Sequence, residues 1–203
     1  MPVKVLIVDD EPALNELFVI GLNKYGYLTK GVLGGKECLE ILSDSYTPDL
    51  ILLDMMMEPM DGWETLIRIK NIENIKQIPI ILQTGKNLTY EEAKRFVCYI
   101  EDYIMKPITP KRCIEYIDET LKKIKLIDDI ISIGISSGYN EIEIKKFATL
   151  YRTILVAKKL LSILEIHYGT VKSDAEYSKF LTGLENEFLL LKESMPIKIE
   201  LSL

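Results

Sequence analysis

The sequence predicts an α/β fold, a doubly wound parallel sheet with helices on both faces, followed by an all-α C-terminal region. Leu50 to Leu53 is an uninterrupted apolar run, and a strand that is buried on both faces has this pattern. Short apolar runs alternate with helical patterns five times within residues 1–125. This alternation predicts parallel strands joined by right-handed crossovers. Beyond residue 125 the apolar residues repeat mainly at helical spacing.

Each predicted strand is a short apolar run that ends in a polar residue or a turn. The first run ends in Asp9 and Asp10, the third in Asp54, and the fourth in Thr84. The fifth leads directly into Lys106. The predicted strands span residues 4–8, 27–33, 50–54, 78–84 and 103–105.

The intervening helices are predicted from their ends as well as from their apolar spacing. Pro12 suits the first turn of the first helix, because the N–H that proline lacks is not needed there. Gly26 closes that helix. Thr89 with Glu92 forms a capping box for the fourth helix, and Thr109 precedes the fifth. The five helices are expected to begin near residues 12, 36, 63, 89 and 110.

The expected strand order is 2-1-3-4-5, the flavodoxin-like arrangement, whose switch point lies between the first and third strands. Asp9, Asp10 and Asp54 would meet at that point. Thr84 and Lys106 end the two neighbouring strands at the same edge. The topology therefore predicts one cluster from five polar residues that are far apart in the sequence.

The chemistry of that cluster favours a hard cation and a phosphoryl group. Three carboxylates on one edge repel one another and stay ionised together only around a cation. Oxygen ligands suit Mg²⁺ rather than zinc. An aspartate such as Asp54 can attack phosphorus and form an aspartyl phosphate. The Lys106 ammonium and the Thr84 hydroxyl can each meet a phosphoryl oxygen.

These segments resemble the receiver domain of two-component response regulators. The matching segments are VLIVDD at 5–10, LILLD at 50–54, MDGWE at 60–64, IPIILQTG at 78–85 and YIMKP at 103–107. The resemblance covers residues 1–125. It implies a phosphorelay protein that is not an enzyme but a signalling phosphoacceptor, which assists its own phosphoryl transfer and dephosphorylation. The implied phosphoryl donor is a sensor histidine kinase.

The resemblance also implies roles for single residues around the cation. Asp54 matches the phosphoacceptor. Asp10, Asp54 and the Met56 main-chain carbonyl match the Mg²⁺ ligands, and Asp9 would help through water. Taken singly, Asp9 and Asp10 are more typical of a helix N-cap, so this interpretation depends on the joint pattern.

Three further residues match the family's switch. Thr84 and Lys106 match the pair that contacts the phosphoryl group, and Tyr103 matches the aromatic switch residue. We expect phosphorylation to draw Thr84 toward the phosphoryl group and Tyr103 to move into the vacated space. That movement would change the surface made by the fourth helix, fifth strand and fifth helix. Alone, Thr84 is typical of a strand end and Tyr103 of a half-buried strand aromatic.

The loop after Asp54 departs from the family pattern. Family members usually carry proline four residues after the phosphoacceptor, whereas here that position is Glu58 and the proline is Pro59. The loop can therefore run differently and bring Glu58 near the metal. Gly85 stands where a small residue such as alanine is usual.

Composition limits the other classes of function. The formal charge of −6 argues against a general affinity for nucleic acid or anionic membranes. The three cysteines, Cys38, Cys98 and Cys113, are predicted to be small buried residues in a reducing compartment. No stretch has the length of a membrane span, and we expect a cytoplasmic protein. The single His167 excludes a site built from several histidines.

Residues 126–203 are predicted to form a helical dimerisation or output region. Gly134 to Gly138 is expected to break the chain, and Asn140 with Glu143 to cap a long helix that ends at Gly169. Ser173 caps a second helix, which ends before Pro196, and residues 197–201 alternate like a short strand. Two amphipathic helices leave apolar surface that pairing in a homodimer would bury.

Two alternative functions remain open for this region, and a homodimer could also form through another surface. The fifth helix carries an apolar seam, Ile114, Ile117, Leu121 and Ile124, that could also pair two copies. A DNA-binding output domain is possible but not favoured, because no compact helix-turn-helix is visible and the basic residues of the first long helix are typical of a solvated face. A histidine phosphotransfer domain would place its phosphorylated residue at His167, at a helix end.

Overall fold

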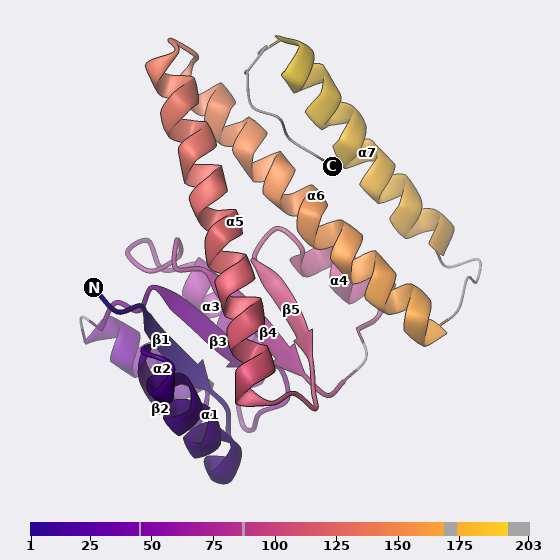
Figure 1. Cartoon of the computed structure of the whole chain (residues 1–203). Helices are drawn as coiled ribbons and strands as arrows, with labels where there is room; N and C mark the ends of the chain where they lie inside the picture. Colours follow the sequence, from indigo (N-terminus) through magenta and orange to yellow (C-terminus); the bar gives the residue numbers. More distant parts are fainter. Residues whose placement is uncertain (45, 87, 169–173, 195–203) are drawn as a thin grey trace. The chain divides into compact units, whose positions relative to one another are not determined.

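The computed structural model describes residues 1–44, 46–86, 88–168 and 174–194 (Figure 1). By compactness the chain divides into two units. The first holds Met1–Lys86 and Tyr99–Asp118, and the second holds Asn87–Cys98 and Glu119–Leu203. The predicted functional boundary at residue 125 stays a prediction.

The first unit is built on a five-stranded parallel sheet with the order β2-β1-β3-β4-β5, which confirms the predicted topology. Its strands are β1 (Lys4–Val8), β2 (Leu28–Val32), β3 (Leu50–Asp54), β4 (Ile80–Thr84) and β5 (Asp102–Met105). Every residue of β3 and β4 is buried, as expected of central strands covered on both faces. Asp54 pairs in register with Gln83, and Thr84 pairs with Met105. The carboxyl ends of these strands are therefore level.

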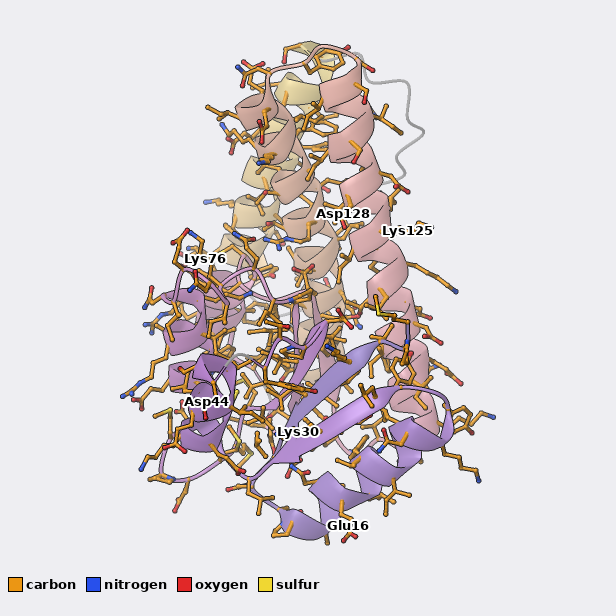
Figure 2. All side chains as sticks on the ribbon, turned by 90° about the vertical axis from the view of Figure 1, so that its left-hand side faces the viewer. Glu16, Lys30, Asp44, Lys76, Lys125 and Asp128 are labelled. Atoms are coloured by element: carbon orange, nitrogen blue, oxygen red, sulfur yellow. The ribbon has the colours of Figure 1, made fainter. Side chains whose placement is uncertain are left out.

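Helices cover both faces of this sheet. The helices are α1 (Pro12–Lys24), α2 (Gly35–Ser43), α3 (Gly62–Lys70) and the first part of α5 (Pro110–Ser136). Figure 2 shows the sheet between two layers, with Glu16 of α1 on one side and Asp44, just after α2, on the other. Proline stands in the first turn of α1 as predicted. The Asp61 carboxylate caps α3 by accepting from the Glu64 N–H at 2.8 Å.

The second unit is helical. It contains α4 (Tyr90–Phe96), the distal part of α5, α6 (Glu141–Tyr168) and α7 (Asp174–Ser194). The predicted capping box of Thr89 and Glu92 is present at α4. Asn140 Oδ1 accepts from the Ile142 and Glu143 N–H groups at the start of α6, as the predicted cap requires.

The predicted hairpin of two long amphipathic helices is confirmed by α6 and α7, which lie side by side (Figure 1). The Phe147 and Phe188 rings stack with centroids 4.7 Å apart. Further along, the Tyr177 hydroxyl donates to the Ala157 carbonyl at 3.2 Å. Because the residue number rises on α6 as it falls on α7 between these contacts, the two helices are antiparallel.

The prediction of a break beginning at Gly134 is wrong. Helix α5 continues to Ser136, and the turn comes at Gly138, whose φ of +87° suits glycine better than other residues. Gly134 is buried inside the helix. A Cβ there would lie 2.4 Å from the Ile144 side chain, so this glycine allows a close contact with α6 and does not end α5.

The remaining predictions differ in their outcome. Cys38 and Cys113 are buried, whereas Cys98 is exposed, so the prediction of burial is wrong for Cys98. The predicted helix stop at Gly169, the cap at Ser173, the end at Pro196 and the strand over residues 197–201 lie outside the described residues. Within the described ranges, no helix has the length and apolar character needed to cross a membrane.

Candidate functional site

Three carboxylates meet at the carboxyl edge of the sheet. Asp9 and Asp10 follow β1, and Asp54 ends β3, the strand that pairs with β1. One carboxylate oxygen from each of the three lies within 4.8 Å of the others. Asp9 and Asp54 are only 3% and 6% exposed, while Asp10 is more open to solvent. The topology therefore brings together the acidic residues that the sequence placed at the switch point.

Lys106 lies between two of these carboxylates. Its Nζ is 2.8 Å from Asp9 Oδ2 and 2.6 Å from Asp54 Oδ2. Burial works against the charge of this ammonium, but the bonds to Asp54 and Asp9 hold the pKa of Lys106 above its ordinary value. One cation thus ties the end of β5 to the ends of β1 and β3.

Charge balance in the cluster is incomplete. Burial raises the pKa of Asp54 above its ordinary value, although Lys106 and the Met56 N–H favour the carboxylate, and the charge of Asp9 raises it further. Lys106 bonds two of the three carboxylates, Asp9 and Asp54, so a single ammonium group is shared between two buried negative charges. A second cation at this position would relieve the repulsion that Lys106 leaves.

Main-chain N–H groups hold each carboxylate in place. The Met56 N–H donates to Asp54 Oδ1 at 3.0 Å, and the Glu58 N–H donates to Asp10 Oδ2 at 3.1 Å. The Glu11 N–H donates to Asp9 Oδ1 at 3.0 Å. The loop after Asp54 therefore contacts Asp10 through the main chain of Glu58. The Glu58–Pro59 and Lys106–Pro107 peptide bonds are both cis.

Gly62 allows α3 to begin close to the end of β3. A Cβ at this position would lie 2.2 Å from the Asp54 carbonyl oxygen, so no other residue fits without a shift. The Gly62 N–H donates to the Met55 carbonyl at 3.0 Å. This close approach fixes the loop that carries Met56 and Glu58.

Thr84 and Tyr103 form a second cluster on the next two strands. Both side chains are buried, and both contact the main chain of Lys86. Thr84 Oγ1 accepts from the Lys86 N–H at 3.0 Å, and the Tyr103 hydroxyl donates to the Lys86 carbonyl at 3.0 Å. Thr84 directly follows Gln83, the register partner of Asp54. The two predicted switch residues therefore share one hydrogen-bonding partner, the main chain of Lys86.

A cavity of about 500 Å³ opens beside the carboxylates. Its lining includes Asp10, Met56, Glu58, Trp63 and Lys86. The Met56 side chain is 58% exposed, and Trp63 is the single tryptophan of the chain. The cavity beside the acidic cluster is therefore lined by both polar and apolar side chains.

Asn15 belongs to the surroundings of the site but was missed in the sequence. Its side-chain amide donates to the Asp9 carbonyl at 3.2 Å and to the Val32 carbonyl at 2.8 Å. The sequence signal that could have found it is the spacing of Asn15 with Phe18 and Leu22. These three residues share the buried face of α1, where an apolar residue is the rule.

The donor set fits a hard divalent cation. Among the described residues, the acidic side chains that converge at this edge offer carboxylate oxygens, and Mg²⁺ prefers a few such oxygens while it retains water. Asp10 and Asp54 could hold it directly and Asp9 through water. When bound, such a cation would neutralise charge on the oxygens of a phosphoryl group.

Comparison with known proteins identifies a family whose fold agrees with the observed strand order. A family model of the response regulator receiver domain matches residues 5–118. A probable cyclic di-GMP phosphodiesterase of Vibrio cholerae is 39% identical over 105 residues, which cover 52% of this chain and 23% of the relative. The DNA-binding dual master transcriptional regulator RpaA of Synechocystis is 28% identical over 120 residues, 59% of this chain and 49% of the relative. The chain thus spans less than half the length of these two relatives.

One relative and two solved structures extend the comparison. The probable transcriptional regulator ycf29 of Porphyra purpurea is 25% identical over 207 residues, and the match covers 96% of each chain. The signal receiver domain of a histidine kinase from Syntrophus aciditrophicus superposes with a TM-score of 0.53 at 30% identity, covering 60% of this chain and 92% of its own. The chemotaxis response regulator CheY4 of Vibrio cholerae, at 23% identity, has a TM-score of 0.53 over 59% and 99% of the two chains and supports the fold alone.

The matched residues 5–118 form all of the sheet except Lys4 and carry Asp9, Asp54 and Lys106 at its carboxyl edge. Because this match takes in more than half of the 203 residues and the strand order agrees, the chain belongs to the response regulator receiver domain family.

Proposed function

We propose that this protein is a response regulator in which Asp54 accepts a phosphoryl group from a sensor histidine kinase in the presence of Mg²⁺. The observation that carries the proposal is the position of Lys106, whose ammonium bonds both Asp9 and Asp54. A buried acidic cluster with one fixed cation suits a reaction that consists mainly of positioning and charge neutralisation. The cytoplasmic location expected from the sequence is part of this proposal.

In the proposed reaction, a carboxylate oxygen of Asp54 forms a bond to phosphorus. The bond from phosphorus to the donor's imidazole nitrogen breaks, and the electron pair leaves with the imidazole. Asp10, Asp54 and the Met56 carbonyl would hold Mg²⁺, with Asp9 acting through water. Lys106 would turn from the Asp54 carboxylate to a phosphoryl oxygen, and the Thr84 hydroxyl would donate to another. The protein is thus a phosphoacceptor rather than an enzyme acting on a separate substrate.

The same proposal includes a switch that begins at Thr84. A Thr84 hydroxyl that turned to the phosphoryl group would give up the Lys86 N–H, and the Tyr103 hydroxyl bonds the carbonyl of the same residue. A change at Thr84 would therefore alter the position of the Lys86 carbonyl that accepts the Tyr103 hydrogen bond. Lys86 stands four residues before Tyr90, where α4 begins, so the change would be passed along the main chain.

Contacts within the second unit support α4 as the receiver of that change. Helix α4 contacts both α6 and α7. The Tyr90 and Tyr177 rings lie with centroids 6.0 Å apart, and Lys94 Nζ lies 3.0 Å from Glu176 Oε1. A movement that begins at Thr84 would therefore reach the helical hairpin through α4.

For the output we propose a homodimer, formed through the C-terminal helices or through α5. Exposed apolar side chains on the helical unit, such as Ile133 and Leu190 at 48% and 69%, support an apolar partner surface. DNA binding is the second candidate, because relatives such as RpaA carry that activity in their names. It is less favoured, since Lys146 and Lys158 of α6 pair with Glu187 and Glu185 of α7 and Lys145 pairs with Glu141.

One experiment tests the acceptor and the output together. The full chain is incubated with phosphoramidate and MgCl₂, and its intact mass and its molar mass by light scattering are measured. We expect one added phosphoryl group, no addition for Asp54→Asn, and a shift toward dimer only in the phosphorylated chain. Phosphoryl uptake by Asp54→Asn would refute the acceptor assignment. A salt-dependent shift of random duplex DNA without a dimer would favour the DNA-binding alternative.

A further inference from the structure

Asn15 is a buried polar side chain placed where the acidic residues of β1 emerge. It lies on α1, only 5% exposed, between the sheet and the helix. Its amide Nδ2 donates to the carbonyls of Asp9, at 3.2 Å, and Val32, at 2.8 Å. These two carbonyls belong to the carboxyl ends of neighbouring strands. Asn15 therefore links the main chain at the end of β1 to the main chain at the end of β2.

This contact continues the β1–β2 pairing past its last register pair. Val8 pairs with Val32, and the Asp9 N–H still donates to the Val32 carbonyl at 3.2 Å. The Val32 carbonyl thus accepts from both the Asp9 main chain and the Asn15 side chain. Because the Asp9 carbonyl is the other acceptor of Asn15, both ends of the Asp9 main chain are fixed.

The sequence of β2 is adapted to this side chain. A Cβ on Gly31 would lie 1.9 Å from Asn15 Oδ1, a distance that no real contact has. Gly31 is therefore required so that Asn15 can lie over the end of β2. The buried amide of Asn15 on α1 and the space left by Gly31 on β2 depend on each other. An ordinary apolar contact between α1 and β2 would require neither residue.

We infer that Asn15 is a positioning residue for the divalent cation, acting through the main chain of Asp9 and Asp10. The inference rests on the proposed function. Without the amide, the two carbonyls lose a buried donor, and the Asp9–Asp10 segment is free to shift relative to Asp54. Ligand oxygens for Mg²⁺ must keep a nearly fixed geometry, so a small shift weakens cation binding more than it weakens the fold.

The test is a titration of the full-length protein with MgCl₂ alone. Trp63 lines the same cavity as Asp10 and is the single tryptophan, so its fluorescence serves as the readout, with the Mg²⁺-induced shift in melting temperature as a second one. The variants are Asn15→Ala and Asn15→Leu, both of which remove the donor, while only the first removes most of the volume. We expect the Kd for Mg²⁺ to rise about tenfold in both.

Tyr27→Phe is the matched control. It removes a hydrogen bond to Asp118 at the opposite end of β2, within the same unit. We expect it to lower the melting temperature but leave the Kd for Mg²⁺ unchanged. If the Asn15 variants also lose stability without any change in Kd, or if Asn15→Leu restores wild-type affinity, the inference is wrong and Asn15 is a packing residue.

Gly31→Ala approaches the same contact from the other strand and remains informative if the Asn15 variants fail to fold. Alone it should weaken Mg²⁺ binding about as much as Asn15→Ala, because its Cβ displaces the amide. Combined with Asn15→Ala it should add less than about twofold, since the nearest obstructing atom, Asn15 Oδ1, is gone and only the Val19 Cγ2, 3.0 Å away, must give way. Full additivity would contradict the inference. A wild-type protein that binds no Mg²⁺ would refute the proposed function itself, which the variants alone cannot do.

Discussion

The Tyr103 hydroxyl donates a 3.0 Å hydrogen bond to the main-chain carbonyl of Lys86, and the Tyr103 side chain is only 1% exposed. The aromatic ring is thus held inside the first unit. Lys86 also donates its N–H to Thr84. One residue therefore joins the two side chains on which the proposed switch depends, and its main chain fixes both.

Removing only that hydroxyl should weaken the fold without harming the acceptor. Tyr103→Phe keeps the ring and loses the bond to Lys86, which should lower the free energy of unfolding by about 1 kcal/mol. Urea denaturation measures the loss. Tyr25→Phe, at a tyrosine that is 55% exposed, is the control and should be neutral. Phosphoryl uptake should stay at the wild-type rate, and a large fall in uptake would mean that Tyr103 acts at the carboxylates.

Removing Lys106 should make stability depend more strongly on pH. Lys106→Met leaves Asp9 and Asp54 without their cation, so the pKa of Asp54, already raised by burial, should rise further. A carboxyl whose pKa is raised on folding loses stability as pH increases from its unfolded pKa through its folded one. We therefore expect a loss of up to about 3 kcal/mol at neutral pH that becomes smaller in acid.

Urea titrations from pH 4 to 8 in EDTA would measure this pH dependence. Lys36→Met is the control, because the Lys36 side chain is 82% exposed, and it should change little at any pH. A loss from Lys106→Met that is the same at pH 4 and pH 8 would show that the ammonium is not balancing the carboxylates.

Magnesium should stabilise the wild-type protein by binding the folded state alone. At ten times the Kd, the expected gain is about 1.4 kcal/mol, seen as a higher melting temperature. Asp54→Asn and Asp10→Asn should each remove most of the gain, whereas Glu40→Gln, on the exposed side of α2, should keep it. An equal shift in all four proteins would indicate a general salt effect.

The helical unit should depend strongly on Phe188. This side chain is fully buried and its ring stacks on those of Phe147 and Tyr151. Phe188→Ala should cost about 3–5 kcal/mol and speed proteolysis within α6 and α7. Leu189→Ala, at the next residue but 48% exposed, should have little effect. Similar proteolysis of both variants would contradict the packing of α7 on α6.

The three cysteines should react with alkylating agents at very different rates. Burial raises the pKa of the Cys38 and Cys113 thiols to about 12, so at pH 8 only about one in ten thousand is a reactive thiolate. Cys98 is exposed. Mass spectrometry after brief treatment with iodoacetamide should find one label in the native protein and three in urea. Fast labelling of Cys38 or Cys113 would show that the core opens.

The fold could be predicted largely because its information is local. Each strand is a continuous apolar run, and helix ends such as Thr89–Glu92 carry their own caps. The alternation then leaves few topologies, and the topology brings Asp9, Asp54 and Lys106 to one edge. The roles of these residues stay predictions, but their convergence follows from strand order.

What could not be predicted depends on contacts between distant residues. Gly134 resembled a helix break because its partner, Ile144, lies beyond the following turn. Asn15 gave no motif, because its acceptors are main-chain carbonyls that any sequence would provide. The association of α4 with α6 and α7 also has no local pattern, since it joins segments from both halves of the sequence.

That association bears on how the protein can be divided. The polypeptide enters the helical unit at Asn87, returns at Tyr99 and leaves again after Asp118, so no single cut separates the two units. A fragment ending at residue 118 would retain α4 but lack α6 and α7, the helices it contacts. A rearrangement that swaps the C-terminal segment would therefore also replace the surroundings of a helix that the receiver segment itself encodes.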